Sequence, residues 1–251
     1  MRILVSNDDG IEAPGIARLA EAAGRVSDDV WIVAPEVKHT AASASITVGR
    51  PLTMRRLGEK RYSCSGRPAD CVVAAMAWLF EGERKPDLVL SGINDGRNVG
   101  EDIAYSGTLG IAREAAFWGV PSIGFSRVKT ARESAGDVAW LAAFIAALWR
   151  RRQDWALEGH YLGVNLPEAL PAAICQPRIG RDKIAGRAEI VEANGERTVI
   201  VVPRGRPHSA TPGDDNSAID AGMVTVNRLN WFGGTPLDAR LLAELEAAAR
   251  T

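Results

Sequence analysis

The sequence predicts an α/β protein built on an open, doubly wound and mostly parallel sheet. Short apolar runs that suit strands alternate along the chain with segments whose apolar residues recur at helical spacing. The runs "ILV", "WIVA" and "LVL" are apolar throughout, as is typical of strands buried on both faces. Alternation of this kind places helices on both sides of a parallel sheet.

The regular elements follow one another from the N-terminus. A strand is predicted at residues 2–7, and a helix at 13–26, where Pro14 stands near the start and Ile16 and Leu19 fall on one face. The pattern then gives a strand at 29–35, one or two additional strands within 45–66, a helix at 69–80, a strand at 87–92, a helix at 107–119, a strand at 121–126, a helix at 135–152 and a strand at 161–167.

The last third of the chain changes character. Two β-rich runs around Asn194 and Gly195 predict a hairpin arm at about 186–203, because Asn-Gly is a favoured hairpin turn. The remaining predicted elements are a polar loop at 204–222, a strand at 223–229 and a C-terminal helix at about 236–250. We expect a single domain over residues 1–251, with its core at about 1–170 and 221–235.

Composition excludes several classes of function. The 251 residues carry a net charge of −1 with both signs well mixed, so the sequence has no basic surface for a nucleic acid polymer. The three cysteines, Cys64, Cys71 and Cys175, have neither disulfide nor zinc spacing. The longest apolar run is too short for a bilayer, and the N-terminus resembles no signal peptide. We therefore expect a soluble cytoplasmic protein that contacts no membrane.

Three polar clusters each follow a predicted strand. Asn7, Asp8 and Asp9 follow the first strand, residues 36–45 follow the second, and residues 91–108 begin at the end of the strand "DLVL". The carboxyl ends of parallel strands share one edge of a sheet, and ligands bind there, near the point where the strand order reverses. The sequence therefore predicts a binding site made from these three clusters.

The adjacent carboxylates of Asp8 and Asp9 have two explanations. Asp-Gly is a common turn dipeptide, so "NDDG" is compatible with a simple tight turn. The second explanation is a metal site, because two neighbouring carboxylates repel each other unless a cation neutralises them. The other two clusters favour the second explanation.

The third cluster has the features of an anion site. Gly96 and its neighbouring glycines let the backbone approach a ligand closely, and Ser106, Gly107 and Thr108 open a helix whose N–H groups and dipole favour a phosphate. An acidic pair beside a bound phosphate would repel it by several kcal/mol, and a divalent cation between them removes this repulsion. Asp8, Asp9, a hydroxyl from the second loop and the amide oxygen of Asn94 are oxygen ligands that suit Mg²⁺ or Mn²⁺.

The motifs that carry these residues resemble those of one family. In order and spacing, "ILVSNDDGIEAPGI", "APEVKHTAASASIT", "GRPADCV", "PDLVLSGINDGRNVGEDIAYSGT" and "DDNSAIDAGMVTVNRL" resemble the survival protein SurE family of metal-dependent nucleotidases. The resemblance covers nearly the whole chain. It implies a Rossmann-like core, a homodimer or homotetramer with exchanged C-terminal elements, and hydrolysis of nucleoside monophosphates to nucleoside and phosphate.

The resemblance also implies a set of site residues. One divalent ion per subunit, Mg²⁺ or Mn²⁺, would be bound by Asp8, Asp9, Thr40 and Asn94. Asp8 and Asp9 would be the catalytic residues, with Asp8 either attacking phosphorus or serving as ligand and base. The residues expected to bind substrate are Asn7, Gly96, Asn98, Ser106, Gly107 and Thr108.

Several positions depart from the family pattern. Thr40 stands where the family usually has Ser, and it keeps the hydroxyl with a stiffer side chain. The other departures are Ala41, Ala44, Asp95, Arg97 and Asp214. They leave the metal ligands in place and bear on substrate preference, so a catalytically weak nucleotide-binding or regulatory module, or a phosphatase of a non-nucleotide phosphate ester, stays an alternative.

Three further side chains have two explanations each. His39 and His208 are either acids for the leaving group or, as lone loop histidines more often are, solvent-exposed. Arg97 either clamps the phosphate or faces solvent.

Overall fold

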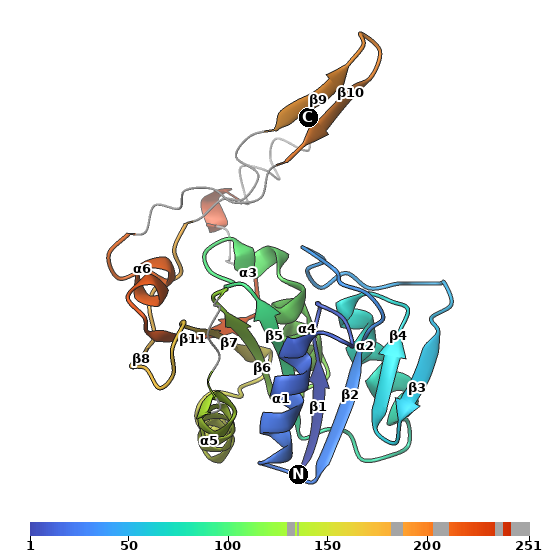
Figure 1. The fold of residues 1–251 in the computed structure, drawn as a ribbon, viewed down its shortest axis with the longest axis vertical. Helices are drawn as coiled ribbons and strands as arrows, with labels where there is room; N and C mark the ends of the chain where they lie inside the picture. Colours follow the sequence, from blue (N-terminus) through green and yellow to red (C-terminus); the bar gives the residue numbers. More distant parts are fainter. Residues whose placement is uncertain (130–133, 135, 182–187, 203–210, 234–237, 242–251) are drawn as a thin grey trace.

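The computed structural model describes residues 1–129, 134, 136–181, 188–202, 211–233 and 238–241 (Figure 1). Within these ranges the main sheet has nine strands in the order β3-β4-β2-β1-β5-β6-β7-β11-β8. The strands are β1 (Arg2–Ser6), β2 (Asp29–Pro35), β3 (Met54–Gly58), β4 (Arg61–Cys64), β5 (Leu88–Asp95), β6 (Ser122–Arg127), β7 (His160–Leu166), β8 (Ile174–Cys175) and β11 (Val224–Asn230).

The predicted doubly wound, mostly parallel sheet is confirmed. Strands β4, β2, β1, β5, β6 and β7 run parallel, whereas β3 is antiparallel to β4 and β11 is antiparallel to β7. From β1 the chain builds outward through β2 and β4, and it then returns to the other side of β1 to build β5, β6 and β7. The strand order therefore reverses between β1 and β5, the place where such sheets bind ligands.

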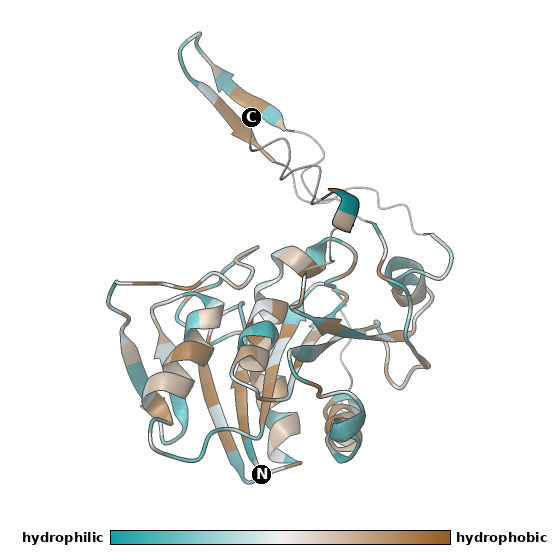
Figure 2. Ribbon diagram, turned by 180° about the vertical axis from the view of Figure 1, so that it is seen from behind, coloured by the Kyte–Doolittle hydropathy of each residue, from teal (hydrophilic) through white to brown (hydrophobic). Residues whose placement is uncertain are grey.

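Helices cover both faces of the sheet. They are α1 (Pro14–Gly24), α2 (Pro68–Ala74) with its π-helical extension η1 (Ala75–Leu79), α3 (Asp102–Tyr105), α4 (Gly107–Phe117), α5 (Gly136–Arg150), the short 3₁₀ turn η2 (Arg152–Asp154) and α6 (Asp215–Asp220). Successive strand side chains point to opposite faces, so Ile3 and Val5 pack with α1 and α5, while Leu4 packs with α2 and α4. Figure 2 shows the hydrophobic central strands between these layers.

The polar segment predicted as a loop contains a helix. Helix α6 lies within residues 204–222, and the carboxylate of Asp214 caps it by accepting from the backbone N–H of Ser217 at 2.8 Å. The helix carries too few apolar residues to show a helical pattern, so its cap is the main sequence signal. Apart from residues 238–241, the predicted C-terminal helix lies outside the described residues.

The predicted hairpin arm is confirmed. Strands β9 (Glu189–Ala193) and β10 (Thr198–Val201) form a separate antiparallel sheet that projects from the side of the molecule where the parallel strands end (Figure 1). Its apolar side chains are exposed, with Ile190 at 70% and Ile200 at 55%. None of the described helices combines the length and apolarity needed to cross a bilayer.

Candidate active site

The three predicted clusters meet at the carboxyl ends of β1 and β5. The main-chain oxygen of Asp8 accepts from the N–H of His39 at 2.7 Å, which ties the loop after β2 to the end of β1. Oδ2 of Asp9 accepts from the N–H of Asp95 at 3.1 Å, which ties the end of β5 to the same place. Oδ1 of Asp8 accepts from Oγ1 of Thr108 at 2.5 Å, so the start of α4 belongs to the site as well.

Asp8 is buried against the start of α4. A Cβ at Gly107 would lie 2.8 Å from both Cβ and Oδ2 of Asp8, so only glycine permits this approach. Burial raises the pKa of Asp8 to about 6, opposed by the Thr108 hydrogen bond and reinforced by the charge of Asp9. The carboxylate of Asp8 is therefore costly to ionise unless a cation lies beside it.

Asp9 is held by a residue that the sequence reasoning did not single out. Its Oδ1 forms an ion pair with Nζ of Lys38, and this hydrogen bond raises the pKa of Lys38 above its usual value. Lys38 lies in the loop after β2, two positions before Thr40. The path of that loop places the ammonium group on Asp9, and sequence spacing alone does not reveal such a path.

Asn94 presents a free oxygen at the end of β5. Its Nδ2 donates to the main-chain oxygen of Gly96 at 2.7 Å, and within the described part of the chain no donor contacts its Oδ1. Gly96 has a φ of 126°, which favours glycine, and its own N–H donates to the main-chain oxygen of Arg127 at 2.9 Å. The N–H of Gly96 is therefore used within the fold and is not free to bind phosphate.

The start of α4 keeps the features of an anion site. Oγ of Ser106 accepts from the N–H of Leu109 at 3.1 Å, which leaves its hydroxyl proton for a ligand. The N–H groups of Gly107 and Thr108 lie in the first helical turn and have no acceptor among the described residues. Together these donors favour an anion beside Asp8.

Two predicted substrate residues have structural partners. Both side-chain atoms of Asn7 bind the backbone of Gly10, at 2.9 and 3.2 Å, and close the turn that follows β1. Nδ2 of Asn98 donates to Oγ of Ser126 at 2.7 Å, and its N–H donates to Oδ1 of Asn165 at 2.8 Å. Asn98 therefore lies at the ends of β6 and β7.

The loop that carries Thr40 is exposed at Thr40 itself and is held against the protein at Ser43. Thr40 is exposed, and among the described residues its side chain has no hydrogen bond. Three residues later, the N–H of Ser43 donates to the main-chain oxygen of Tyr105 at 2.9 Å, and a Cβ at Gly110 would lie 2.1 Å from the oxygen of Ser43. The loop is thus packed against the start of α4, and the Thr40 hydroxyl stays available to a ligand.

His39 and Arg97 differ from the roles considered for them. His39 is partly buried, and burial followed by the charge of Arg67 lowers its pKa, which favours the neutral imidazole. Nη1 of Arg97 pairs with Oδ1 of Asp220 in α6 at 2.6 Å, so Arg97 has a carboxylate partner within the fold. His208 lies outside the described residues.

A buried carboxylate that sequence reasoning missed organises the loop after β5. Asp215 is 1% exposed and accepts from the N–H groups of Gly100 and Gly180, each at 2.8 Å. The only sequence signal is a second Asp pair in a polar segment, which predicts no partner. Asp215 has a structural role, because both oxygens are used by the backbone.

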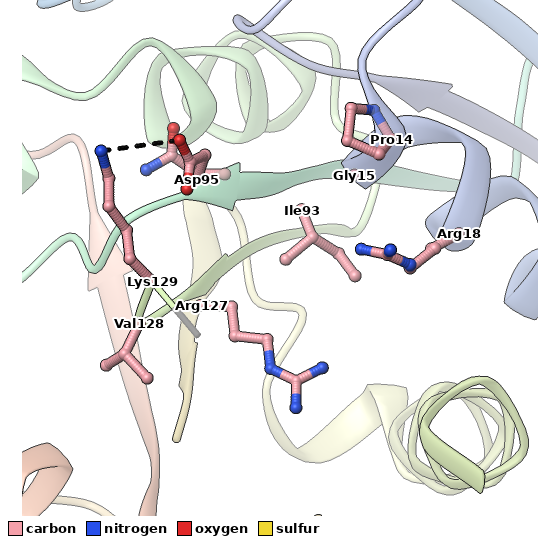
Figure 3. Close-up of a pocket in the computed structure, with 9 residues that line it drawn as sticks. Pro14, Gly15, Arg18, Ile93, Asp95, Arg127, Val128 and Lys129 are labelled. Atoms are coloured by element: carbon pink, nitrogen blue, oxygen red, sulfur yellow. Dashed lines mark ion pairs between the residues drawn. The ribbon is translucent and has the colours of Figure 1, made fainter. Parts of the chain in front are cut away.

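A cavity of about 120 Å³ lies on the α1 side of β5 (Figure 3). Arg18, Ile93 and Arg127 surround it in Figure 3, and Asn94 is the one predicted metal ligand on its wall. Arg127 is engaged by Asp137 at 2.6 Å and by the main-chain oxygen of Glu168 at 2.7 Å. The charge of Arg127 is therefore neutralised within the fold and is not available to a ligand. For this reason the candidate site remains the one around Asp8.

The donor set at Asp8 fits a hard divalent cation. Two carboxylates, the free amide oxygen of Asn94 and the open hydroxyl of Thr40 are all oxygen ligands. Within the described ranges no group of three or more His, Cys, Asp or Glu side chains is placed to hold a metal. The chemistry of the donors matches Mg²⁺ or Mn²⁺.

Comparison with known proteins identifies the family. Residues 3–189 match the model of the family described as survival protein SurE. The chain is 40% identical over 240 residues to 5′-nucleotidase SurE of Rhizorhabdus wittichii, covering 92% of this chain and 93% of that protein, and 38% identical over 244 residues to 5′-nucleotidase SurE of Paramagnetospirillum magneticum, covering 91% and 89%.

A solved structure supports the same relationship over the full length. The SurE protein from Aquifex aeolicus superimposes with a TM-score of 0.74 at 30% identity, covering 100% of both chains. The motifs, the sheet topology and these similarities agree. The chain belongs to the SurE family of survival proteins.

Proposed function

We propose that the protein is a metal-dependent 5′-nucleotidase that hydrolyses nucleoside monophosphates to nucleoside and inorganic phosphate. The observation that carries this proposal is the contact between Asp8 and Gly107 and Thr108 at the start of α4, which supports an acidic pair beside an anion site. The names of the relatives support the nucleotidase activity. The donor set and its surroundings support the metal requirement.

One Mg²⁺ or Mn²⁺ ion per subunit would be held by Asp8, Asp9, Thr40 and Asn94. When bound, the ion neutralises the acidic pair and polarises phosphoryl oxygen and water. The carboxylates bring the negative charge, and the two neutral oxygens complete the ligand set. This arrangement removes the repulsion that Asp8 and Asp9 would otherwise exert on a phosphate.

The chain's own groups orient the substrate. The hydroxyl of Ser106 and the N–H groups of Gly107 and Thr108 donate to phosphate oxygens, and Asn98 borders the site from the ends of β6 and β7. Oδ1 of Asp8 accepts from Thr108, so Oδ2 is the oxygen that would face the reacting phosphate. As proton acceptor or as nucleophile, Asp8 uses this same atom.

We further propose that residues 1–251 form one domain and that the arm joins subunits in a homodimer or homotetramer. Asp215 supports the single domain, because its carboxylate links Gly100, in the loop after β5, to Gly180, on the segment that precedes the arm. The exposed apolar side chains of β9 and β10 support the oligomer, because a two-stranded hairpin is marginal alone and needs a partner surface.

The function is tested by phosphate release. Purified protein, stripped of metal, is assayed on a panel of nucleoside monophosphates and simple phosphate esters with Mg²⁺, with Mn²⁺ and with chelator. We expect turnover of nucleoside monophosphates that chelator abolishes and metal restores. Turnover that chelator leaves unchanged would contradict the metal site. Faster turnover of simple esters would indicate a phosphatase of another ester, and nucleotide binding without turnover would indicate a regulatory module.

A further inference from the structure

Lys38 forms a contact with the acidic pair that the proposed mechanism does not use. Its ammonium group pairs with Oδ1 of Asp9, whose side chain is 8% exposed, while the Lys38 side chain itself is 50% exposed. The other oxygen of Asp9 accepts from the N–H of Asp95 at 3.1 Å. Both oxygens of this buried carboxylate are therefore occupied by donors from the protein.

The charges around Lys38 explain why it stays there. Asp9, Asp95 and Asp8 all attract its ammonium group. A second lysine, Lys129, lies farther out, with Nζ 3.6 Å from Oδ2 of Asp95. Two lysines thus offset part of the negative charge of three carboxylates, and only Lys38 contacts a predicted metal ligand.

We propose that Lys38 is a built-in counter-ion that occupies Asp9 until a divalent ion binds, and that it thereby lowers the metal affinity of the site. The inference rests on the proposed role of Asp9 as a metal ligand. A divalent cation on Oδ1 of Asp9 and an ammonium group on the same oxygen repel each other strongly at such short separation. The ammonium group must move away before the ion binds Asp9 in full.

The side chain is suited to this exchange. Half of it is exposed and its long, flexible stem lets the ammonium group leave Asp9 without moving the backbone. Without metal, the ammonium group limits the repulsion between Asp9 and the buried Asp8. Lys38 is a positioning residue in this scheme, because it acts on the site through Asp9.

The test measures metal binding directly. Metal-free full-length protein is titrated with Mn²⁺ and the free ion is followed by electron paramagnetic resonance, for the wild type and for Lys38→Gln, Lys38→Arg and Lys129→Gln. Removing the competing charge should tighten the dissociation constant of Lys38→Gln about tenfold. Lys38→Arg keeps the charge and should stay within about twofold of the wild type, as should Lys129→Gln, which removes a lysine that does not contact a ligand.

Thermal melts give a second readout. Without metal, Lys38→Gln should melt below the wild type, because Asp9 loses its partner, and its rise in melting temperature with Mn²⁺ should be larger. Unchanged or weaker Mn²⁺ binding by Lys38→Gln would overturn the inference. An equal gain in Mn²⁺ affinity in Lys129→Gln would overturn it as well. Absence of Mn²⁺ binding by the wild type would overturn the proposed metal site and this inference with it.

Discussion

Oγ1 of Thr108 donates a 2.5 Å hydrogen bond to Oδ1 of Asp8 across 100 positions of sequence. Both side chains are buried, so the bond fixes the carboxylate without competition from water. It joins the end of β1 to the start of α4, which are the acidic side and the anion side of the candidate site. It also stabilises the ionised carboxyl and so limits the rise in the pKa of Asp8 that burial causes.

Replacing Thr108 by Val should weaken metal binding in a pH-dependent way. Val has a similar shape and no hydroxyl, so the pKa of Asp8 should rise further and protons should compete better with the metal. A hydrogen bond to a charged group is worth about 1.5–3 kcal/mol, so we expect a loss of roughly tenfold or more in Mn²⁺ affinity at pH 6 and a smaller loss at pH 8. Thr108→Ser keeps the donor and is the control. Equal losses for both variants would show that packing, not the hydrogen bond, matters.

Asp8→Asn should abolish turnover and stabilise the metal-free protein. The pKa of Asp8 is raised from 3.8 to about 6, so the folded state holds this proton more tightly than the unfolded state. Stability contributed by the neutral form is complete below pH 4 and is lost as the pH rises to about 6. At pH 7 the substitution should recover up to about 3 kcal/mol, since one pKa unit corresponds to about 1.4 kcal/mol.

Thermal melts at pH 4 and pH 7, with and without Mn²⁺, check the Asp8 prediction. The metal-free Asp8→Asn protein should melt above the wild type at pH 7 and only slightly above it at pH 4. The variant should also lose the rise in melting temperature that Mn²⁺ causes in the wild type. A simple turn role for Asp8 predicts the opposite, because Asn is an equally good turn residue and activity would persist.

Thr40 should contribute only its hydroxyl. Thr40→Ser should bind Mn²⁺ as the wild type does, whereas Thr40→Val, which keeps the branched shape, should lose about tenfold in affinity. Because the side chain is exposed and has no hydrogen bond among the described residues, neither change should alter the melting temperature of the metal-free protein. Identical Mn²⁺ titrations for Thr40→Val and the wild type would remove Thr40 from the ligand set.

Gly15 should be required for the placement of Asn94. A Cβ at Gly15 would lie 2.0 Å from the main-chain oxygen of Ile93, so Gly15→Ala forces the start of α1 away from the end of β5. We expect about 1–3 kcal/mol of destabilisation and weaker metal binding. Gly24 is the matched control in the same helix, because a Cβ there meets nothing within 4 Å, and Gly24→Ala should be neutral or stabilise by up to about 1 kcal/mol. Chemical unfolding measures the stability of both variants. Equal changes in the free energy of unfolding would exclude the contact between Gly15 and Ile93 as the cause.

Deleting residues 187–202 should yield a monomer. The exposed apolar residues of β9 and β10 are the surface that we expect a second subunit to cover. Size-exclusion chromatography with light scattering should show an oligomer for the full chain and a monomer for the deletion at micromolar concentration. A monomeric full chain would refute the proposed assembly.

The sheet and its helices were predictable because their signals are local. Buried strands such as β1 and β5 are continuous apolar runs, and α1 has apolar residues at helical spacing behind a proline. The meeting of the three polar clusters at the candidate site was also predictable, because the carboxyl ends of parallel strands share one edge of the sheet. The convergence of Asp8, Asp9 and Thr108 follows from that topology.

The partners of individual side chains were not predictable in the same way. Lys38 meets Asp9 because of the path of one loop, and Arg97 meets Asp220 because α6 folds within a segment too polar to show a helical pattern. The use of the N–H of Gly96 by Arg127 depends on the bulged end of β5. Such pairings are set by the packing of segments far apart in the chain, and residue type and spacing do not encode them locally.

Asp215 joins two parts of the molecule that have different tasks. One of its oxygens holds Gly100, in the loop after β5, and the other holds Gly180, on the segment that leads toward the arm. In mechanical terms, a force on the segment that holds Gly180 passes through this carboxylate to the loop after β5, beside the proposed phosphate site. A second contact, the 2.8 Å ion pair between Arg181 and Glu101, joins the same two segments, so a displacement of either segment would be shared with the other.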